Sequence, residues 1–476
     1  MAPTTAQPAA THSLLPAADQ AGRVESHGID YIPEAERHGR ARELFAVWAA
    51  PNVGYLALVV GGTLVLMGLS LWQALAVIVV GNLFSVLTGI VAASGPASGT
   101  PSEVITRAMF GVRGNRVNIL VTSWFISVCY LALNWAAASY TAFRLAERFG
   151  IEVNLAVKIV LILAIAGITL AVSVYGHATI VRLYQPLALV LTAVFVVMAA
   201  FVLGRADWGY QPAEPLHGIG LWAVVAAGLA IVASAPLSYT NSADFARYLP
   251  SATSPVAVAG WTTLGAFVPS VLTTGLGALA ATALNMADPE TALEGVLPSW
   301  FIPVFLIAVI VGTMANNAMT AYSSGLALQA VGLRLRRSRS VLLDGSIGAA
   351  MTMYALLVSN FLDTVSNMMQ LVVTVMGPVM AVYVADVLWR RNDYDGPGLS
   401  DQTPASPYWY TAGVNWAGAI AVLVGIALSL LCVAAEVYTG PIAKAIGGVD
   451  LSLPVGLLVP AVLYVVLMGR REQGAR

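Results

Sequence analysis

Long stretches of the chain carry no charged or histidine side chain. The first covers residues 44–102, and similar stretches follow at 117–143, 159–176, 183–204, 218–243, 248–287, 295–333, 345–362, 364–385, 402–435 and 451–469. A bilayer core is about 30 Å thick, so a helix needs roughly 20 apolar residues to cross it. Each later stretch fits one crossing, and the first is long enough for two with a turn at 68–70.

The pattern therefore predicts an all-α polytopic membrane protein with twelve transmembrane helices. The spans are expected near 44–67, 71–93, 117–143, 154–176, 180–203, 219–241, 260–286, 300–330, 341–359, 364–389, 411–435 and 453–469. The composition agrees, because 58% of the residues are hydrophobic and only 10% are charged, against about a quarter charged in a soluble domain. The net charge of −1 provides no field for nucleic acid.

Basic residues gather in alternate loops. Examples before the first span or after an even number of spans are Arg42, Arg116, Arg247, Arg337 and Arg470. The other loops hold few cations and several acids. Because Lys and Arg favour the cytoplasmic side of a membrane, both termini are expected in the cytoplasm, and the chain in the plasma membrane.

Two predicted spans contain helix-breaking residues. Span 44–67 has Pro51 and Gly54 in its first third, and span 219–241 has Pro236 between two serines. Proline removes a backbone donor and disturbs the preceding turn, which leaves carbonyls free in mid-membrane. Interrupted helices at comparable places in two halves of a chain indicate a transporter binding site. Simple kinks, which transmembrane helices tolerate, are the alternative.

Four short motifs occur in order along the chain. They are IPEAERHG at 32–39, SADFARYLP at 242–250, NNAMTAYSSGL at 316–326, and Pro378 with the Ala385-Asp386 pair. In content and order they resemble the nucleobase:cation symporter 1 family, the purine–cytosine permeases. The resemblance extends over residues 32–391 and so covers most of the chain.

The resemblance implies a fold and an activity. The fold is a leucine-transporter-like pair of inverted five-helix repeats at 37–203 and 204–391, followed by a linker at 392–410 and two further helices within 411–476. The Ala-, Pro- and Thr-rich start, 1–36, is expected to be a disordered cytoplasmic tail. The implied activity is secondary active import of a nucleobase, cytosine or a purine for example, with a cation.

The candidate substrate contacts are uncharged. No span has a carboxylate or Lys near its middle, and such groups are expensive in a membrane unless they function there. A neutral, planar ligand is therefore expected. Tyr130 and Asn134 lie four residues apart on one helix face, where the ring would stack on the ligand and the amide would bond it. In the family a Trp stands where this chain has Tyr130. The alternatives are core packing for Tyr130 and an interhelical hydrogen bond for Asn134.

Further candidate contacts come from three other helices. They are Asn52 and Gly54 in the first span, Ser234 and Ser238 in the sixth, and Asn316, Asn317 and Thr320 in the eighth. Adjacent residues of a helix point about 100° apart, so one asparagine of the eighth span can face the ligand while the other faces a neighbouring helix or a cation. The two serines equally fit close helix packing.

The coupling ion is left open between sodium and a proton. A cation site would involve Ala50, Val53, Ala315 and Asn316. The resemblance implies paired hydroxyls in this part of the eighth span, which this chain lacks, so sodium is in doubt, yet no buried carboxylate or His stands out as a proton carrier. Asp244 and Arg247 suit an ion pair or inner gate; a solvated helix end is the alternative.

The sequence thus predicts a monomeric transporter and no enzyme, with no cofactor, no metal cluster and no nucleic-acid partner. Its partners are a small nucleobase-like substrate and the lipid bilayer. Allantoin, hydantoin or a thiamine-precursor pyrimidine is the nearest alternative cargo. A membrane sensor that keeps the transporter body is a further alternative, although it would need a soluble domain or a titratable cluster.

Overall fold

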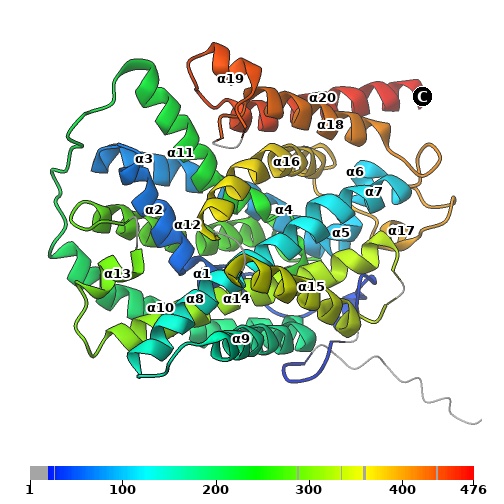
Figure 1. Cartoon of the computed structure of the whole chain (residues 1–476). Coiled ribbons are helices and arrows are strands. Elements are labelled where there is room, and N and C mark those ends of the chain that lie inside the picture. The colour runs from blue at the N-terminus through cyan, green and yellow to red at the C-terminus, as the bar shows by residue number, and fades with distance from the viewer. Residues whose placement is uncertain are drawn as a thin grey trace, which may run out of the picture.

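The computed structural model describes residues 20–25, 27–286, 289–333, 335–357, 361–435 and 438–475. Within them almost all regular structure is helical, as predicted. The short helices are η1 (Glu34–Glu36), α5 (Ser102–Ile105), α6 (Arg107–Phe110), η3 (Ser242–Phe245), α13 (Pro289–Glu294), α17 (Gly396–Ser400) and α19 (Pro441–Ala445). Figure 1 shows the long helices packed side by side around a central group that includes α1, α8, α12 and α14.

Ten helical segments of the described chain are long and apolar enough to cross a membrane. They comprise α3 with α4 (Leu71–Asn82, Ser85–Ser98), α7 with η2 and α8 (Val112–Ile119, Leu120–Phe125, Ile126–Arg148), α9 (Leu155–Tyr175), α10 (His177–Leu203), α11 (Gly218–Ser238), α12 (Pro255–Ala281), α14 (Ile302–Val331), α15 (Arg337–Leu357), α16 (Phe361–Trp389) and α20 (Ser452–Ala475). The bent pair α1 (Glu43–Asn52) and α2 (Tyr55–Leu66) adds an eleventh.

The remaining predicted span, 411–435, corresponds to α18 (Trp416–Cys432), an apolar helix of 17 residues. This is shorter than the roughly 20 residues that a perpendicular crossing needs. A helix therefore lies at each of the twelve predicted positions, and the polytopic all-α fold class is confirmed.

Both predicted breaks are interruptions rather than gentle kinks. Helix α1 ends one residue after Pro51, Gly54 is extended (φ −143°, ψ 160°), and α2 leaves at 57° to α1. Helix α11 runs through Pro236, ends at Ser238 and continues as an irregular turn into η3. The second interruption thus begins at the end of the predicted segment 234–238. Because Pro236 has no N–H, the carbonyl four residues earlier lacks its helical donor.

Glycines set the close approach of α2 to α12. A Cβ atom on Gly61 would lie 1.8 Å from the carbonyl oxygen of Thr274, and one on Gly277 would lie 2.0 Å from that of Leu58. Only glycine permits backbones this near to each other. Contacts between small residues are the usual way to pack helices where lipid removes the hydrophobic driving force. They hold the broken first span against the seventh.

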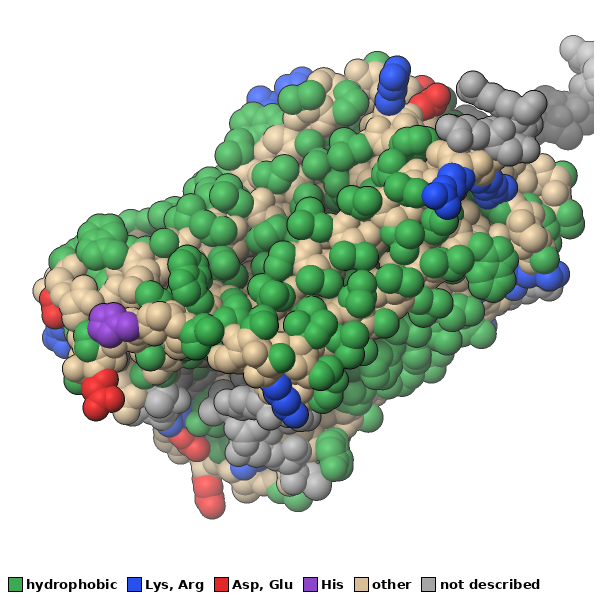
Figure 2. Space-filling model, turned by 90° about the horizontal axis from the view of Figure 1, so that it is seen from above, with side chains coloured by type: hydrophobic (Ala, Val, Ile, Leu, Met, Phe, Trp, Pro, Cys, Tyr) green, Lys and Arg blue, Asp and Glu red, His purple; other side chains and the backbone are tan. Residues whose placement is uncertain are grey.

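The surface matches a lipid environment. On the face formed near α18, α19 and α20, hydrophobic side chains cover the broad middle, and charged side chains gather toward the two ends (Figure 2). Leu423 of α18 and Leu458 and Val462 of α20 are exposed. An apolar belt between two polar rims is what a bilayer of about 30 Å selects, and the protein is a multi-pass membrane protein.

The part of the expected tail that the structure describes is not disordered. Glu25 and Ile32 are buried, and the N–H of Ile32 donates to the carbonyl of Gly99 at 2.9 Å. Residues 1–19 and 26 of the predicted tail lie outside the described residues. We call the end of the bundle that carries residues 20–38 the N-terminal side; the end of α20 lies toward the same end in Figure 1.

Candidate functional site

Two adjoining cavities lie between the interrupted helices, each of about 80 Å³. The first is lined by residues of α1, α2, α8, α11, α12 and α14, and the second by residues of α2, η2, α8, α11, α14 and the turn after α11. They share the lining residues Leu56, Asn134, Ala235, Tyr239 and Asn316. No charged side chain lines either cavity among the described residues.

The structure brings together all but one of the predicted substrate contacts. Asn52, Gly54 and Ser234 line the first cavity, Tyr130, Ser238 and Thr320 line the second, and Asn134 and Asn316 line both. Asn317 lines neither cavity and is completely buried. Residues from four separated helices therefore converge on one region, where the first and sixth spans are interrupted.

The two adjacent asparagines of α14 have different environments. The amide nitrogen of Asn317 donates to the carbonyl of Leu131 at 2.9 Å, and its oxygen accepts from the Asn134 amide at 2.9 Å. Asn317 is thus fully engaged in joining α14 to α8. The Asn316 side chain makes no hydrogen bond within the described chain, so its donor and acceptor are available in the cavities.

The hydroxyl groups add acceptors. Ser234 donates to the carbonyl of Ile231 and Ser238 to that of Ala235, both at 2.7 Å. Their protons are used within α11, whereas their lone pairs remain. The Tyr130 hydroxyl is buried with no partner of normal hydrogen-bond geometry in the described residues. A buried polar atom without a partner is rare, and this one belongs to a residue that lines the second cavity.

Two aromatic side chains connect the interruptions. Trp48 of α1 and Tyr239, which follows α11, have ring centroids 4.8 Å apart in an edge-on arrangement, a favourable geometry for aromatic pairs. Tyr239 lines both cavities. Trp48 was not among the site residues predicted from the sequence, although an aromatic side chain one turn before a broken segment could have indicated it. It also missed Ser270 and Thr274, which α12 contributes.

The candidate cation ligands are partly engaged by protein groups. The carbonyl of Ala315 accepts a hydrogen bond from the Tyr184 hydroxyl of α10. A Cβ on Gly312 would lie 2.9 Å from the carbonyl oxygen of Val53, so that carbonyl packs against α14. In the described residues no group of three or more His, Cys, Asp or Glu side chains suits a metal ion.

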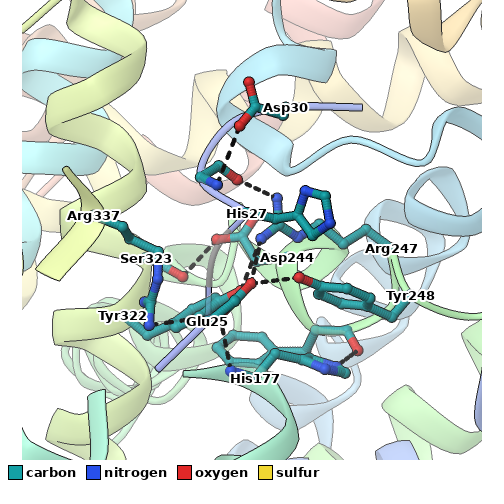
Figure 3. A network of polar contacts seen from close by, with 12 residues as sticks. Glu25, His27, Asp30, His177, Asp244, Arg247, Tyr248, Tyr322, Ser323 and Arg337 are labelled. Carbon is teal, nitrogen blue, oxygen red and sulfur yellow. Dashed lines mark hydrogen bonds and ion pairs between the residues drawn. The ribbon is translucent and has the colours of Figure 1, made fainter. Parts of the chain in front are cut away.

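A buried ionic network lies on the N-terminal side (Figure 3). Glu25 accepts from Arg247 at 2.9 Å, Tyr248 at 2.6 Å and Tyr322 at 3.1 Å through one oxygen. Its other oxygen lies 3.5 Å from Arg337. Burial alone would raise the pKa of Glu25, but Arg337 and Arg247 lower it to about 2. This carboxylate therefore stays ionised at any physiological pH.

The local pair expected between Asp244 and Arg247 is not formed. Arg247 pairs with Glu25 instead, and Asp244 accepts from the backbone N–H of Ser102 at 2.8 Å and from the Ser323 hydroxyl at 2.5 Å. Both side chains are completely buried, so a solvated helix end is also wrong. Sequence reasoning missed Glu25 because it lies in a segment with the composition of a tail.

A bundle of apolar helices, two of them interrupted beside uncharged cavities, is the architecture of a secondary transporter. Residues 31–456 match the model of the permease family for cytosine/purines, uracil, thiamine and allantoin. The chain belongs to this family, the nucleobase:cation symporter 1 family, as the motifs indicated.

Individual relatives carry several substrate names. The putative purine-cytosine permease YxlA of Bacillus subtilis is 29% identical over 460 residues, which cover 94% of this chain and 97% of that protein. The cytosine permease of Escherichia coli K12 is 27% identical over 387 residues, or 77% and 80% of the two chains. The allantoin permease of Bacillus subtilis is 24% identical and covers 94% of both chains.

Solved structures show the same fold. Mhp1, a nucleobase-cation-symport-1 family transporter, in a closed conformation with bromovinylhydantoin bound, matches with a TM-score of 0.74 at 18% identity over 96% of each chain. The inward-facing conformation of Mhp1 matches with a TM-score of 0.70 at 19% identity, over 95% of this chain and 96% of that one. The predicted leucine-transporter-like architecture is thereby confirmed.

Proposed function

We propose that the protein imports a neutral nucleobase or a similar heterocycle, together with a cation, by alternating access. The observation that carries the proposal is the free amide of Asn316, which lies in cavities lined entirely by uncharged side chains. An amide offers a donor and an acceptor, as the edge of a nucleobase does. A zwitterion or cation would leave its charge without a partner there, which is costly.

The ligand position follows from the surrounding groups. The Tyr130 ring supplies a flat apolar face, and Asn134, whose nitrogen is used by Asn317, retains its oxygen as an acceptor. Ring stacking selects planar molecules, and the amides select the hydrogen-bonding edge. Cytosine, uracil and purines are the first candidates, and allantoin and hydantoins are the second, because relatives with names of both kinds align over most of this chain.

Transport would follow the symmetry of the fold. The broken helices α1 with α2 and α11, together with the α3–α4 span and α12, rock against α8, α9, α14 and α15 around the fixed cavities. The N-terminal side is the cytoplasmic side, because the alternate loops rich in Arg lie there, and both termini are cytoplasmic in the plasma membrane. The Glu25 network keeps this side closed until the substrate has bound.

The proposal is tested by uptake into proteoliposomes. Radiolabelled cytosine, uracil, hypoxanthine and allantoin are compared, first with sodium on the outside and then with sodium replaced and an inward proton gradient imposed. At least one base is expected to accumulate, and Asn316→Ala should reduce its uptake at least about tenfold, since two hydrogen bonds are each worth about 1 kcal/mol. A wild-type protein that transports none of the four, or an Asn316→Ala variant with normal uptake, would contradict the proposal.

A further inference from the structure

Two carboxyl groups lie together on the N-terminal side, outside the membrane-spanning helices. They belong to Glu103 of α5 and Asp244 of η3, which are 1% and 0% exposed. The two elements are in contact, because the N–H of Ser102 donates to Asp244 at 2.8 Å and the N–H of Ala243 donates to the Ser102 hydroxyl at 3.2 Å. Ser102 directly precedes Glu103, so its contact with Asp244 brings the two buried acids into adjoining segments, where the charge of Asp244 raises the pKa of Glu103.

Such a contact requires a proton. Two carboxylates that share a dry site cannot both ionise, because each raises the pKa of the other. The Oε2 atom of Glu103 has no donor among the described residues, as expected of a carboxyl oxygen that carries a proton. Burial and the neighbouring Asp244 raise the pKa of Glu103 well above its usual range.

The surroundings favour one proton on Glu103 and a negative charge on Asp244. Burial raises the pKa of Asp244 as well, but a backbone N–H, the Ser323 hydroxyl and the nearby Arg247 stabilise its charged form. The other ionisable groups that face the pair are Tyr322 of α14 and Tyr383 of α16. Arg247 does not neutralise the pair fully, since its ion pair is with Glu25 (Figure 3).

One hydroxyl connects the pair with the substrate cavities. Ser123 of η2 lines the second cavity, and its hydroxyl donates to the Oε1 atom of Glu103 at 3.1 Å. A hydrated proton in that cavity can be passed to Ser123 as the hydroxyl gives its own proton to Glu103, which leaves a neutral water and a neutral Ser123 behind. The count of protons is balanced, and no other reactant is needed. Among the described residues, this is the contact by which Glu103 reaches the cavity.

The pair also joins elements that must separate when the N-terminal side opens. Asp244 follows α11, whereas its partner Ser323 belongs to α14 and the partner of Glu103 belongs to η2. Opening would draw η3 away from α14 and admit water. A separated, hydrated carboxyl group has an ordinary pKa near 4, and the proton would leave on that side.

We propose that the Glu103–Asp244 pair is the proton-binding site that couples substrate import to the proton gradient. The inference rests on the proposed function and specifies its coupling ion. It assigns a titratable site outside the cavities, in place of the sodium site considered around Ala50 and Ala315. One proton would enter from the cavity with each substrate and leave on the N-terminal side.

The test separates substrate exchange from energised accumulation in proteoliposomes. Counterflow of whichever radiolabelled base the wild type transports needs no net proton movement, whereas accumulation against a gradient does. Glu103→Gln is expected to retain counterflow, because the glutamine amide can donate to Asp244 as the protonated acid does. Its accumulation under an inward proton gradient should disappear, with the inside-to-outside ratio falling to one. Asp244→Asn provides a second variant of the same pair.

Asp344→Asn is the matched control, since Asp344 is also a buried acid but accepts from Trp124 and Ser324 rather than facing another acid. It should retain proton-driven accumulation. The affinity of the wild type for substrate should weaken up to tenfold per pH unit above the pKa of the pair, and that of Glu103→Gln should be independent of pH.

Three outcomes would overturn the inference. They are accumulation by Glu103→Gln equal to that of the wild type, loss of proton coupling in Asp344→Asn alone, and wild-type accumulation driven by sodium at equal pH. In each of these cases counterflow still reports a functional transporter. Absence of counterflow for all four bases in the wild type would instead remove the proposed function, so the two failures are distinguishable.

Discussion

Asn316 and Asn317 are neighbours in sequence whose substitution should have opposite effects. Asn316→Ala should lose substrate binding and keep its thermal stability, because the side chain makes no hydrogen bond within the described chain. Asn317→Ala should lower the free energy of unfolding by about 1–3 kcal/mol, since it leaves the buried Asn134 amide nitrogen without its acceptor and removes the side-chain hydrogen bond to the Leu131 carbonyl. Thermal unfolding and ligand binding are measured on the two purified variants. A destabilised Asn316→Ala together with a stable Asn317→Ala that no longer binds ligand would contradict the structure.

At this scale the sequence identified residue types better than orientations. Polar side chains in apolar spans singled out Asn134, Asn316 and Asn317 correctly as unusual. Sequence alone could not tell which asparagine faces the cavities, because a rotation of about 100° separates adjacent positions and the rotation of a helix about its axis depends on packing. The orientation of the Asn317 side chain depends on its contacts with Asn134 and Leu131 of α8, which lie 183 and 186 residues away along the chain.

The described part of the N-terminal segment is attached to the bundle through the buried Glu25. Glu25→Gln removes the charge between Arg247 and Arg337, and breaking a buried ion pair costs about 3–5 kcal/mol. We expect the closed N-terminal side to open more often. The measurement is maleimide labelling of a cysteine at the buried position Ala246, in a chain whose native cysteines are replaced, and its rate should rise at least about tenfold.

Glu36→Gln is the control for this experiment. Glu36 lies on the same segment, but its ion pair, at 2.8 Å, is with His27 near the surface, where such pairs contribute about 0–1 kcal/mol. Its labelling rate should stay within about twofold of the wild-type rate. Equal acceleration in both variants would show that any change in the segment opens the N-terminal side, and Glu25 would have no special role.

The last two membrane helices are joined to the body by a buried acid. Asp386 of α16 accepts from Tyr464 of α20 at 2.5 Å and from Tyr394 at 2.9 Å. Tyr464→Phe should therefore lower stability by about 1.5–3 kcal/mol, the range for hydrogen bonds to charged groups, while uptake changes little because Tyr464 does not line either cavity. The loss of stability is measured by thermal unfolding, with Tyr438→Phe at an exposed position as the control. Equal stability of the two variants would argue against an attachment of α20 to α16 through Asp386.

The positions of the membrane helices were predicted well, because they depend on the local absence of charge. The buried segments outside these helices were predicted poorly, because their burial depends on distant residues. Every predicted span has a helix because uncharged length is a local property. The packed segment around Glu25 was missed, since its partner Arg247 lies 222 residues away. The acid pair of Glu103 and Asp244 was missed for the same reason: each acid lies in a polar loop by composition, and only the folded chain brings the two together.

For the whole molecule, the buried acids Glu25 and Glu103 make stability respond to pH in opposite ways. The pKa of Glu25 is lowered, so its stabilisation is present above its usual pKa of 4.5 and is lost only as the pH falls toward about 2. The pKa of Glu103 is raised. The folded state therefore binds a proton that the unfolded state has released, and this stabilisation is lost as the pH rises through the raised pKa.

Between pH 5 and 8 the pair should dominate the difference between the wild type and Glu103→Gln. The free energy of unfolding of the wild type should fall relative to that of the variant as the pH rises, with a limiting slope of about 1.4 kcal/mol per pH unit for one proton, and its apparent melting temperature should fall with it. Taking the difference removes the contribution of the five histidines, which both proteins share. Parallel melting profiles across this range would mean that the pair holds no titrating proton, and the coupling site would have to be sought elsewhere.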